Sequence, residues 1–422
     1  MKKLFILIAA ITLISALILG GCSQTNTSVT APAPAPTTTA ASPAAKTTAP
    51  TSALVATTAV PPAAQTTTSA PTAASTLTPK YGGTFRTADN IVPSRSIGWF
   101  ADGTTFIHGI ETPLIIETLL KGDVNGVIGP NLATAYEVDK DLKTITLTLR
   151  QGVKFHDGSD FNAAVVKWNL DQFINAKLGD IKGLNSVDVI DNYTVRLNTA
   201  QVTNLLITAL ANAHMVSEDA YNKNGGDKGG KEYLRWHPVG TGPFKFVSYE
   251  TGVRLKAAKF DNYWQKGKPY LDAVEVNYIA DPMTRSSAFE AGELDACTAD
   301  ASKVDYDLQQ KGYNVTKSAV GFVCLTGDSK NTGSPFSNVK VRQAVDYAID
   351  KEAIVKSLGY GFYSAADQFA NPGTSAYIKD LQSRKYDPAI AKQTLTAAGY
   401  ASGFSCKLYG GTTTTKEVVT AI

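Results

Sequence analysis

One cysteine near the amino terminus lies in a sequence that predicts its chemical modification. Two lysines at positions 2 and 3 precede an apolar run over residues 4–19, and two glycines then lead into Cys22. Positive charge, a short apolar core and small residues are typical of a secretory signal, and the run is shorter than the roughly 20 residues of a membrane span. A cysteine directly after such residues is typical of a bacterial lipobox, whose thiol receives diacylglycerol. We therefore predict a lipoprotein signal peptide over residues 1–22, a lipid anchor on Cys22, and a location at the outer face of the cytoplasmic membrane, on the cell surface or in the periplasm.

Two other short strings match reactive motifs only in part. Residues 225–231 have the glycine and lysine spacing of a phosphate-binding loop, but Glu232 replaces the Ser or Thr that would hold magnesium, so we expect a hydrated surface loop. Ser337 and Lys340 match the SxxK pattern of penicillin-recognising acyl enzymes, but no Ser-Asp-Asn or Lys-Thr-Gly string accompanies them. An acyl enzyme at Ser337 is therefore a distant alternative, and we predict no catalytic residue.

Metal-ligating side chains are few and scattered. The four histidines form no His-x-x-x-His pair, and the cysteines form no Cys-x-x-Cys, so we predict neither a metal site nor a cofactor. Beyond Cys22 the cysteines are Cys297, Cys324 and Cys406. This odd number allows one disulfide in an oxidising compartment, but we expect buried free thiols.

The composition separates a tether from a globular body. Residues 23–80 are nearly all Ala, Thr, Pro and Ser, with no aromatic residue, and bury too little apolar surface to offset their ordering entropy. We predict a disordered linker there. The remaining residues, about 340, have the bulk of two or three domains. A net charge of only +3, without a lysine or arginine stripe, gives no reason to expect nucleic acid as a partner.

Hydrophobic periodicity predicts a mixed α/β body. Half-buried strands are predicted from alternating residues at 143–150, 193–197 and 274–278. Helices are predicted after the capping residues Asn162, Asp350 and Asp387, over residues 341–348, and from Lys416. Strands and helices are interspersed along the chain, as in an α/β fold.

Seven strings in this body resemble, in unbroken order, the signature of the family 5 extracellular solute-binding proteins, the receptors of peptide and nickel ABC importers. The strings lie at residues 131–137, 152–158, 239–246, 262–272, 288–295, 341–350 and 386–388. The resemblance runs from Tyr81 to about Phe404. It implies an α/β two-lobed clamp of the periplasmic-binding-protein type II, in which a ligand between the lobes favours closure and a membrane permease reads the closed form.

By analogy with the family, the domains can be placed on this chain. The implied core of lobe I covers residues 81–115 and 232–315, an inserted subdomain covers 116–231, and a partial lobe II covers 316–422. Relatives continue beyond Ile422, and in peptide-binding relatives the aspartate that pairs with the amino terminus of the ligand lies in that later stretch. We therefore expect that residues 81–422 alone do not close on a ligand as a stable two-lobed protein.

The resemblance also suggests residues of lobe I that contact the ligand. In peptide-binding relatives, the loop before the helix that ends in a Leu-Leu pair lines the cleft, and here that loop is residues 108–112, ahead of Leu119-Leu120. Gly109 would allow close backbone approach and Glu111 could attract a cation; the alternative is an ordinary turn with Glu111 solvated. The predicted ligand-binding residues are Trp99, Asp102, Gly109, Ile110, Glu111 and Thr112. For His156 we expect a structural role.

These observations favour a lipid-anchored, monomeric receptor that captures a small solute for an ABC importer. Short peptides are the preferred ligand, because main-chain hydrogen bonds and charged termini let such a receptor accept varied side chains. A nickel chelate or an oligosaccharide on the same scaffold is the alternative, since the fold does not decide the ligand.

Overall fold

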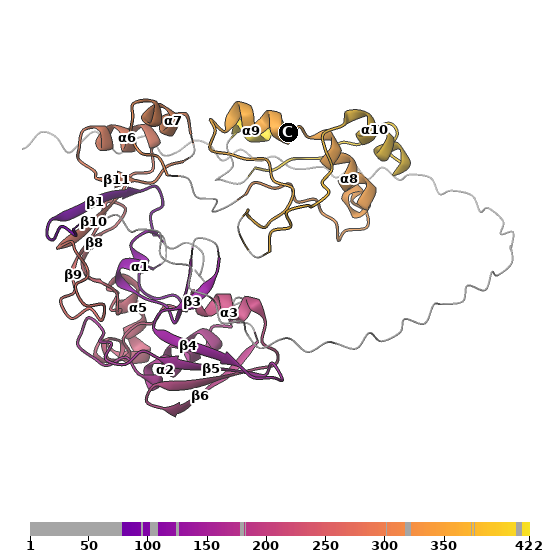
Figure 1. Cartoon of the computed structure of the whole chain (residues 1–422). Coiled ribbons are helices and arrows are strands. Elements are labelled where there is room, and N and C mark those ends of the chain that lie inside the picture. The colour runs from indigo at the N-terminus through magenta and orange to yellow at the C-terminus, as the bar shows by residue number, and fades with distance from the viewer. Residues whose placement is uncertain are drawn as a thin grey trace, which may run out of the picture. The chain divides into compact units, whose positions relative to one another are not determined.

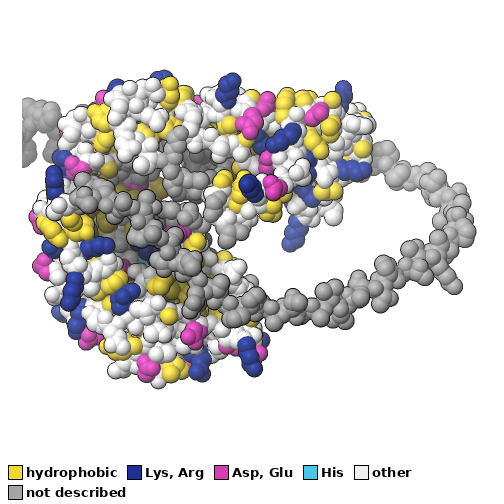
Figure 2. Space-filling model, in the orientation of Figure 1, with side chains coloured by type: hydrophobic (Ala, Val, Ile, Leu, Met, Phe, Trp, Pro, Cys, Tyr) yellow, Lys and Arg dark blue, Asp and Glu magenta, His cyan; other side chains and the backbone are white. Residues whose placement is uncertain are grey.

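The computed structural model describes residues 78–93, 96–101, 109–123, 126–177, 181, 183–300, 302–316, 322–372, 374, 376–410 and 416–422. The predicted signal peptide, the lipidation site Cys22 and nearly all of the predicted linker lie outside these residues. On the face shown in Figure 2, Lys and Arg side chains are interspersed with Asp and Glu, in keeping with the small net charge of +3.

A five-stranded sheet with the order β11-β1-β10-β9-β8 forms the first layer (Figure 1). Its strands are β1 (Thr84–Asp89), β8 (Phe244–Glu250), β9 (Arg254–Lys259), β10 (Ala273–Tyr278) and β11 (Ala296–Cys297). Strand β1 pairs in parallel with both β10 and β11, whereas β8, β9 and β10 pair antiparallel. The register of β1 and β10 sets Asp89 opposite Tyr278, so both residues lie at the C-terminal ends of parallel strands.

A second, antiparallel sheet has the order β4-β5-β7-β6. Its strands are β4 (Ala133–Val138), β5 (Thr144–Leu149), β6 (Leu184–Asp191) and β7 (Thr194–Thr199), and a separate hairpin joins β2 (Leu120–Gly122) to β3 (Ile128–Pro130). In β5 the predicted alternation holds: Ile145, Leu147 and Leu149 are buried and the intervening threonines are not. The three strands predicted from alternation are thus confirmed.

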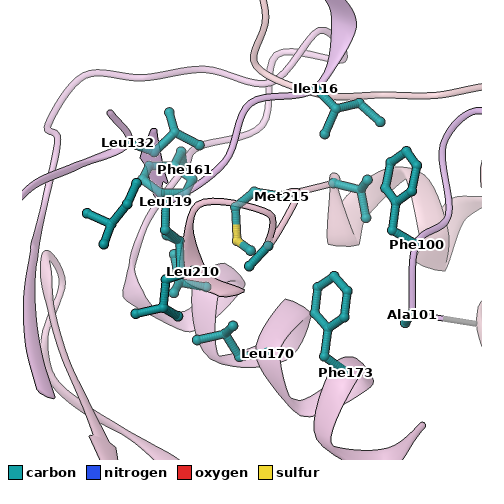
Figure 3. Close-up of a cluster of buried hydrophobic side chains, with 14 of the residues drawn as sticks. Phe100, Ala101, Ile116, Leu119, Leu132, Phe161, Leu170, Phe173, Leu210 and Met215 are labelled. Atoms are coloured by element: carbon teal, nitrogen blue, oxygen red, sulfur yellow. The ribbon is translucent and has the colours of Figure 1, made fainter. Parts of the chain in front are cut away.

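Several helices begin after a capping side chain, whereas α1 (Thr112–Ile115) and α5 (Gly230–Trp236) have none. Around the two sheets lie these two helices together with α2 (Ala163–Asn175), α3 (Asn204–Leu210), α4 (Glu218–Lys223), α6 (Pro282–Glu290) and α7 (Lys303–Gln310). The side chain of Asn162 accepts a hydrogen bond from the backbone N–H of Val165 and caps α2, as predicted. The buried Leu170 and Phe173 of α2 pack into the cluster drawn in Figure 3.

One hydrophobic core joins both sheets. It contains Ile145 and Leu197 of the antiparallel sheet together with Leu255 and Val276 of the five-stranded sheet. The five strands of the parallel-containing sheet fall in the ranges expected for the lobe I core, and the four strands of the other sheet fall in the range expected for the insertion. The domain boundaries themselves stay a prediction.

The C-terminal part is helical in its described residues. It contains α8 (Val339–Ala348), α9 (Lys351–Leu358), α10 (Pro388–Ala397) and α11 (Lys416–Ala421), drawn in orange and yellow in Figure 1. Helices α8 and α10 pack together and bury Val341, Ala344 and Ala391. Asp350 and Asp387 accept hydrogen bonds from the first turns of α9 and α10, and α11 begins at Lys416, so the predicted helix starts are confirmed.

Two expectations are wrong. The free thiols of Cys324 and Cys406 are exposed and that of Cys297 is half-buried, because the part of the chain that holds the first two buries few side chains in its described residues. Residues 225–231 are not simply a loop: a 3₁₀ turn covers Gly226–Lys228 and α5 begins at Gly230. Gly230 is buried because its Cα lies close to the carbonyl oxygen of Tyr221, where an added Cβ would be only 2.2 Å away.

A close backbone approach fixes the Gly-Thr-Gly string of residues 240–242. A Cβ at Gly240 would lie 2.2 Å from the carbonyl oxygen of Ile115 and 2.7 Å from Cα of Ile116. Neither backbone atom can move without shifting the end of α1. Only glycine fits at this position.

We predict that Gly240→Ala lowers the free energy of unfolding by about 1–3 kcal/mol, because the added methyl group overpacks backbone against backbone. Denaturant titration of the purified protein measures this. Gly129→Ala is the matched control, since its Cβ would meet nothing closer than 4.0 Å. Equal midpoints for the two variants would contradict the prediction.

Candidate ligand-binding site

The predicted ligand-binding loop leads into a helix that is shorter than expected. Gly109, Ile110 and Glu111 precede α1, whose first residue is Thr112. The helix ends at Ile115, so the Leu119-Leu120 pair lies beyond it and Leu120 begins β2. The expectation that this pair ends the helix is therefore wrong. Consecutive β-branched residues favour the extended backbone that follows, with φ −124° and ψ 124° at residue 116.

The other two predicted contacts lie in the preceding segment. Asp102 is outside the described residues. Trp99 is 4% exposed; its ring stacks on Tyr221 at 5.5 Å and meets Trp168 edge-on at 6.1 Å. These contacts give Trp99 a packing role against α2 and α4. A ligand contact at Trp99 or Asp102 stays a prediction.

Glu111 is buried, with 1% of its surface exposed. The alternative of a solvated Glu111 is thus wrong. Its carboxyl group folds over Gly109, where a Cβ would lie 2.1 Å from Oε2. The absent side chain of Gly109 therefore leaves the space that the carboxyl group occupies. Within the described part of the chain, Oε2 of Glu111 has no hydrogen-bond partner.

The surroundings of Glu111 disfavour its charged form. Burial is the main cause and raises its pKa from 4.5 to about 7, and the charge of Asp89 raises it further, while hydrogen bonds from the backbone of Glu111 and Gly109 oppose the shift. Asp89 is itself 4% exposed and accepts hydrogen bonds from the backbone N–H groups of Ile91 and Ile110, at 3.1 and 3.3 Å. Two carboxyl groups therefore share one buried edge of the sheet.

Sequence reasoning missed a second buried carboxyl group, that of Glu117. Its Oε1 accepts a hydrogen bond from the Tyr263 hydroxyl at 2.9 Å, and its Oε2 accepts from Thr241 Oγ1 and Trp264 Nε1, both at 2.8 Å. Burial raises the pKa of Glu117, and these three donors oppose the shift. The sequence signal was an acid within the apolar string at residues 115–120, which marks a candidate buried carboxylate.

His156 has the structural role expected of it. Its Nε2 lies 2.9 Å from the carbonyl oxygen of Gly242, and its backbone N–H donates to the carbonyl oxygen of Gly240. Burial lowers the pKa of His156 to about 4, so the ring is neutral at neutral pH.

The acyl-enzyme alternative has no geometric support. Ser337 closes a 3₁₀ turn (Pro335–Ser337), whereas the exposed Lys340 lies in α8, so the two residues do not share a helical turn. The hydroxyl of Ser337 donates to the carbonyl oxygen of Ser334 at 2.8 Å. Within the described ranges, no three His, Cys, Asp or Glu side chains come together as metal ligands. Nor is any helix of those ranges long and apolar enough to cross a membrane.

We predict that stability falls as pH rises from about 4.5 to about 7, by about 3 kcal/mol in total, because folded Glu111 retains a proton that the unfolded chain releases. Glu111→Gln removes this dependence and is more stable than the parent above pH 7. Thermal unfolding at a series of pH values measures both effects. The exposed Glu137→Gln serves as control, and a Glu111→Gln profile that follows the control would contradict the prediction.

We also predict that Glu117→Gln destabilises the protein by about 1–3 kcal/mol, because an amide NH₂ would replace one oxygen that faces donors. The Trp264 indole cannot turn its N–H elsewhere, as a hydroxyl can. Denaturant midpoints of this variant and of Glu137→Gln are compared. If Glu117→Gln lowers the free energy of unfolding no more than Glu137→Gln does, the hydrogen bonds of Glu117 do not stabilise the fold as predicted.

Curated relatives of the chain are binding proteins. The glutathione-binding protein GsiB of Salmonella typhi is 37% identical over 289 residues, which are 66% of this chain and 54% of that protein. The same protein of Escherichia coli O157:H7 is 35% identical over the same length. The chain thus spans about half the length of the curated relatives that it matches.

Solved structures share the fold. NikZ from Campylobacter jejuni, in complex with Ni(L-His), gives a TM-score of 0.64 at 23% identity, covering 75% of this chain and 63% of that one. AppA from Bacillus subtilis, in complex with a nonapeptide, gives 0.63 at 25% identity, covering 76% and 65%. These are two-lobed periplasmic binding proteins of type II, which confirms the predicted fold class. The model for the middle region of the bacterial extracellular solute-binding proteins, family 5, matches residues 127–422, and the chain belongs to this family.

Proposed function

We propose that this protein is the substrate-binding component of an ABC importer and captures short peptides outside the cytoplasmic membrane for delivery to a permease. The family match over residues 127–422 is the observation that carries the proposal. Several relatives have peptides as ligands: GsiB is named for glutathione, AppA was solved with a nonapeptide, and DppA from Helicobacter pylori with the peptide STSA. Binding by lobe closure requires no covalent chemistry.

The proposal includes the anchoring of the protein to the membrane by a lipid. Acylation of Cys22 would anchor the chain, and the linker of residues 23–80 would hold a monomeric body away from the bilayer. Trp99, Asp102 and residues 109–112 are the proposed ligand contacts of lobe I.

A nickel chelate is the second candidate ligand. NikZ was solved with Ni(L-His), and NikA from Brucella suis with Fe(III)-EDTA, on the same fold. A chelate would be held as a preformed complex, so the protein need not supply a full set of metal ligands.

Disrupting the encoding gene in the source bacterium should abolish the uptake of short peptides that depends on this protein. We expect loss of radiolabelled di- and tripeptide uptake at limiting concentration, with unchanged uptake of nickel-histidine and of oligosaccharides, and restoration by the intact gene. Loss of nickel uptake alone would favour the second candidate. Unchanged uptake of all three ligands would overturn the proposal.

A further inference from the structure

Two buried polar groups at the C-terminal ends of strands in the five-stranded sheet have no hydrogen-bond partner among the described residues. They are Oε2 of Glu111 and the hydroxyl of Tyr278, on side chains that are 1% and 7% exposed. Buried polar groups are nearly always paired in folded proteins, so each unpaired one needs an explanation. In a protein that binds a solute, a partner supplied by the ligand is such an explanation.

The two groups lie together with a second acid. Asp89 and Tyr278 are paired in the parallel register of β1 and β10, and Asp89 accepts a hydrogen bond from the backbone N–H of Ile110, the residue before Glu111, at 3.3 Å. The charges of Glu111 and Asp89 both raise the pKa of Tyr278. The ring of Tyr249 meets that of Tyr278 edge-on at 6.0 Å, and the Tyr249 hydroxyl donates to the carbonyl oxygen of Pro93 at 3.4 Å. No Lys, Arg or His of the described residues is among the groups that shift the pKa of Glu111.

A buried arginine after β10 shows how a carboxylate near this end of the sheet is neutralised by the protein itself. Arg285 is 2% exposed and forms an ion pair with Asp300. Its guanidinium also donates to the carbonyl oxygens of Ile279 at 2.5 Å and Thr298 at 2.9 Å. Asp300 therefore has its cation within the fold, whereas Asp89 and Glu111 form no ion pair with another described residue.

The position of the acid pair fits a ligand site. Asp89 and Tyr278 end the parallel strands β1 and β10, and Glu111 closes the connection that follows β1. Ligands of open α/β sheets bind outside the carboxyl ends of such strands.

We propose that Asp89, Glu111 and Tyr278 form a subsite for a protonated amine of the ligand, an inference that rests on the proposed function. An ammonium group has three N–H donors and a compact charge. The two carboxyl groups and the phenol oxygen offer it acceptors. In a site that excludes water, this pairing is stronger than it would be at the surface.

The same chemistry makes binding depend on pH. Among the residues that the structure describes, the titratable groups that interact electrostatically with Glu111 are Asp89 from β1, Tyr249 from β8 and Tyr278 from β10. Glu111 is half-protonated near pH 7 in the free protein, and the ammonium group favours its ionised form. Binding of a lysine side-chain amine, which stays protonated in this range, therefore strengthens from pH 6 to pH 8, whereas a terminal amine with a pKa of about 8 gains less because it loses its own proton.

The test compares three peptides in the source bacterium: Ala-Lys-Ala, its form acetylated on the side chain, and its form acetylated on both amines. A chromosomal Glu111→Gln substitution should lower gene-dependent uptake of the amine peptide about tenfold or more relative to the doubly acetylated one. The singly acetylated peptide shows whether the amine is that of the side chain or of the amino terminus. Glu137→Gln should change none of these ratios.

An unchanged ratio in Glu111→Gln, with peptide uptake still dependent on the gene, overturns the subsite and leaves the proposed function intact. Absence of any gene-dependent peptide uptake overturns the function itself. If Glu111→Gln does not accumulate, the ¹³C carboxyl titration of Glu111 in the purified full chain decides. Millimolar n-butylammonium should lower its pKa from about 7, and an unaltered titration overturns the proposal.

Discussion

A single buried carboxyl group, that of Glu117, holds together three segments that are far apart in the sequence. Its donors Thr241, Tyr263 and Trp264 lie 124, 146 and 147 residues away. Since a buried carboxylate is costly unless its oxygens are hydrogen-bonded, these three contacts form together or the carboxylate is left unsatisfied. The guanidinium of Arg150 lies 4.1 Å from the centre of the Trp264 ring and adds a fourth segment to the assembly. The turn from α1 into β2 is fixed by these contacts, and the loop before α1 is positioned by that turn.

This centre explains why some of the family strings have the residues they do. In the string at residues 239–246, Thr241 supplies a donor to Glu117, and the glycines on either side let its backbone pass against the end of α1. The string at residues 152–158 contributes His156, which is kept neutral by burial and bonds to the same Gly-Thr-Gly backbone. These two strings therefore pack against each other and against the end of α1. They are not themselves the proposed ligand contacts.

Local features of the fold could be predicted from the sequence, because their causes lie within a few residues. The cap at Asn162, the alternation in β5 and the start of α10 after Asp387 depend on neighbours in the chain. The burial of Glu111 could not be predicted, since it depends on strands that end 22 residues earlier and 167 residues later, at Asp89 and Tyr278. The partners of Glu117 could not be predicted either, because they are more than 100 residues away in the sequence. Both carboxyl groups belong to long-range contacts, which hydrophobic periodicity does not report.

The two buried acids differ in their surroundings: those of Glu117 indicate a structural role, and those of Glu111 are the basis of the proposed subsite. Both oxygens of Glu117 accept hydrogen bonds, from three donors in all, so this carboxyl group is satisfied by contacts within the fold. Glu111 has an unpartnered oxygen, a second acid beside it and no cation among the groups that shift its pKa in the described part of the chain. Both Asp89 and Glu111 precede the residues that match the family model, which begin at 127. The proposed subsite therefore lies before the region matched by that model, and the ligand preference proposed for this edge rests on these side chains and not on the fold.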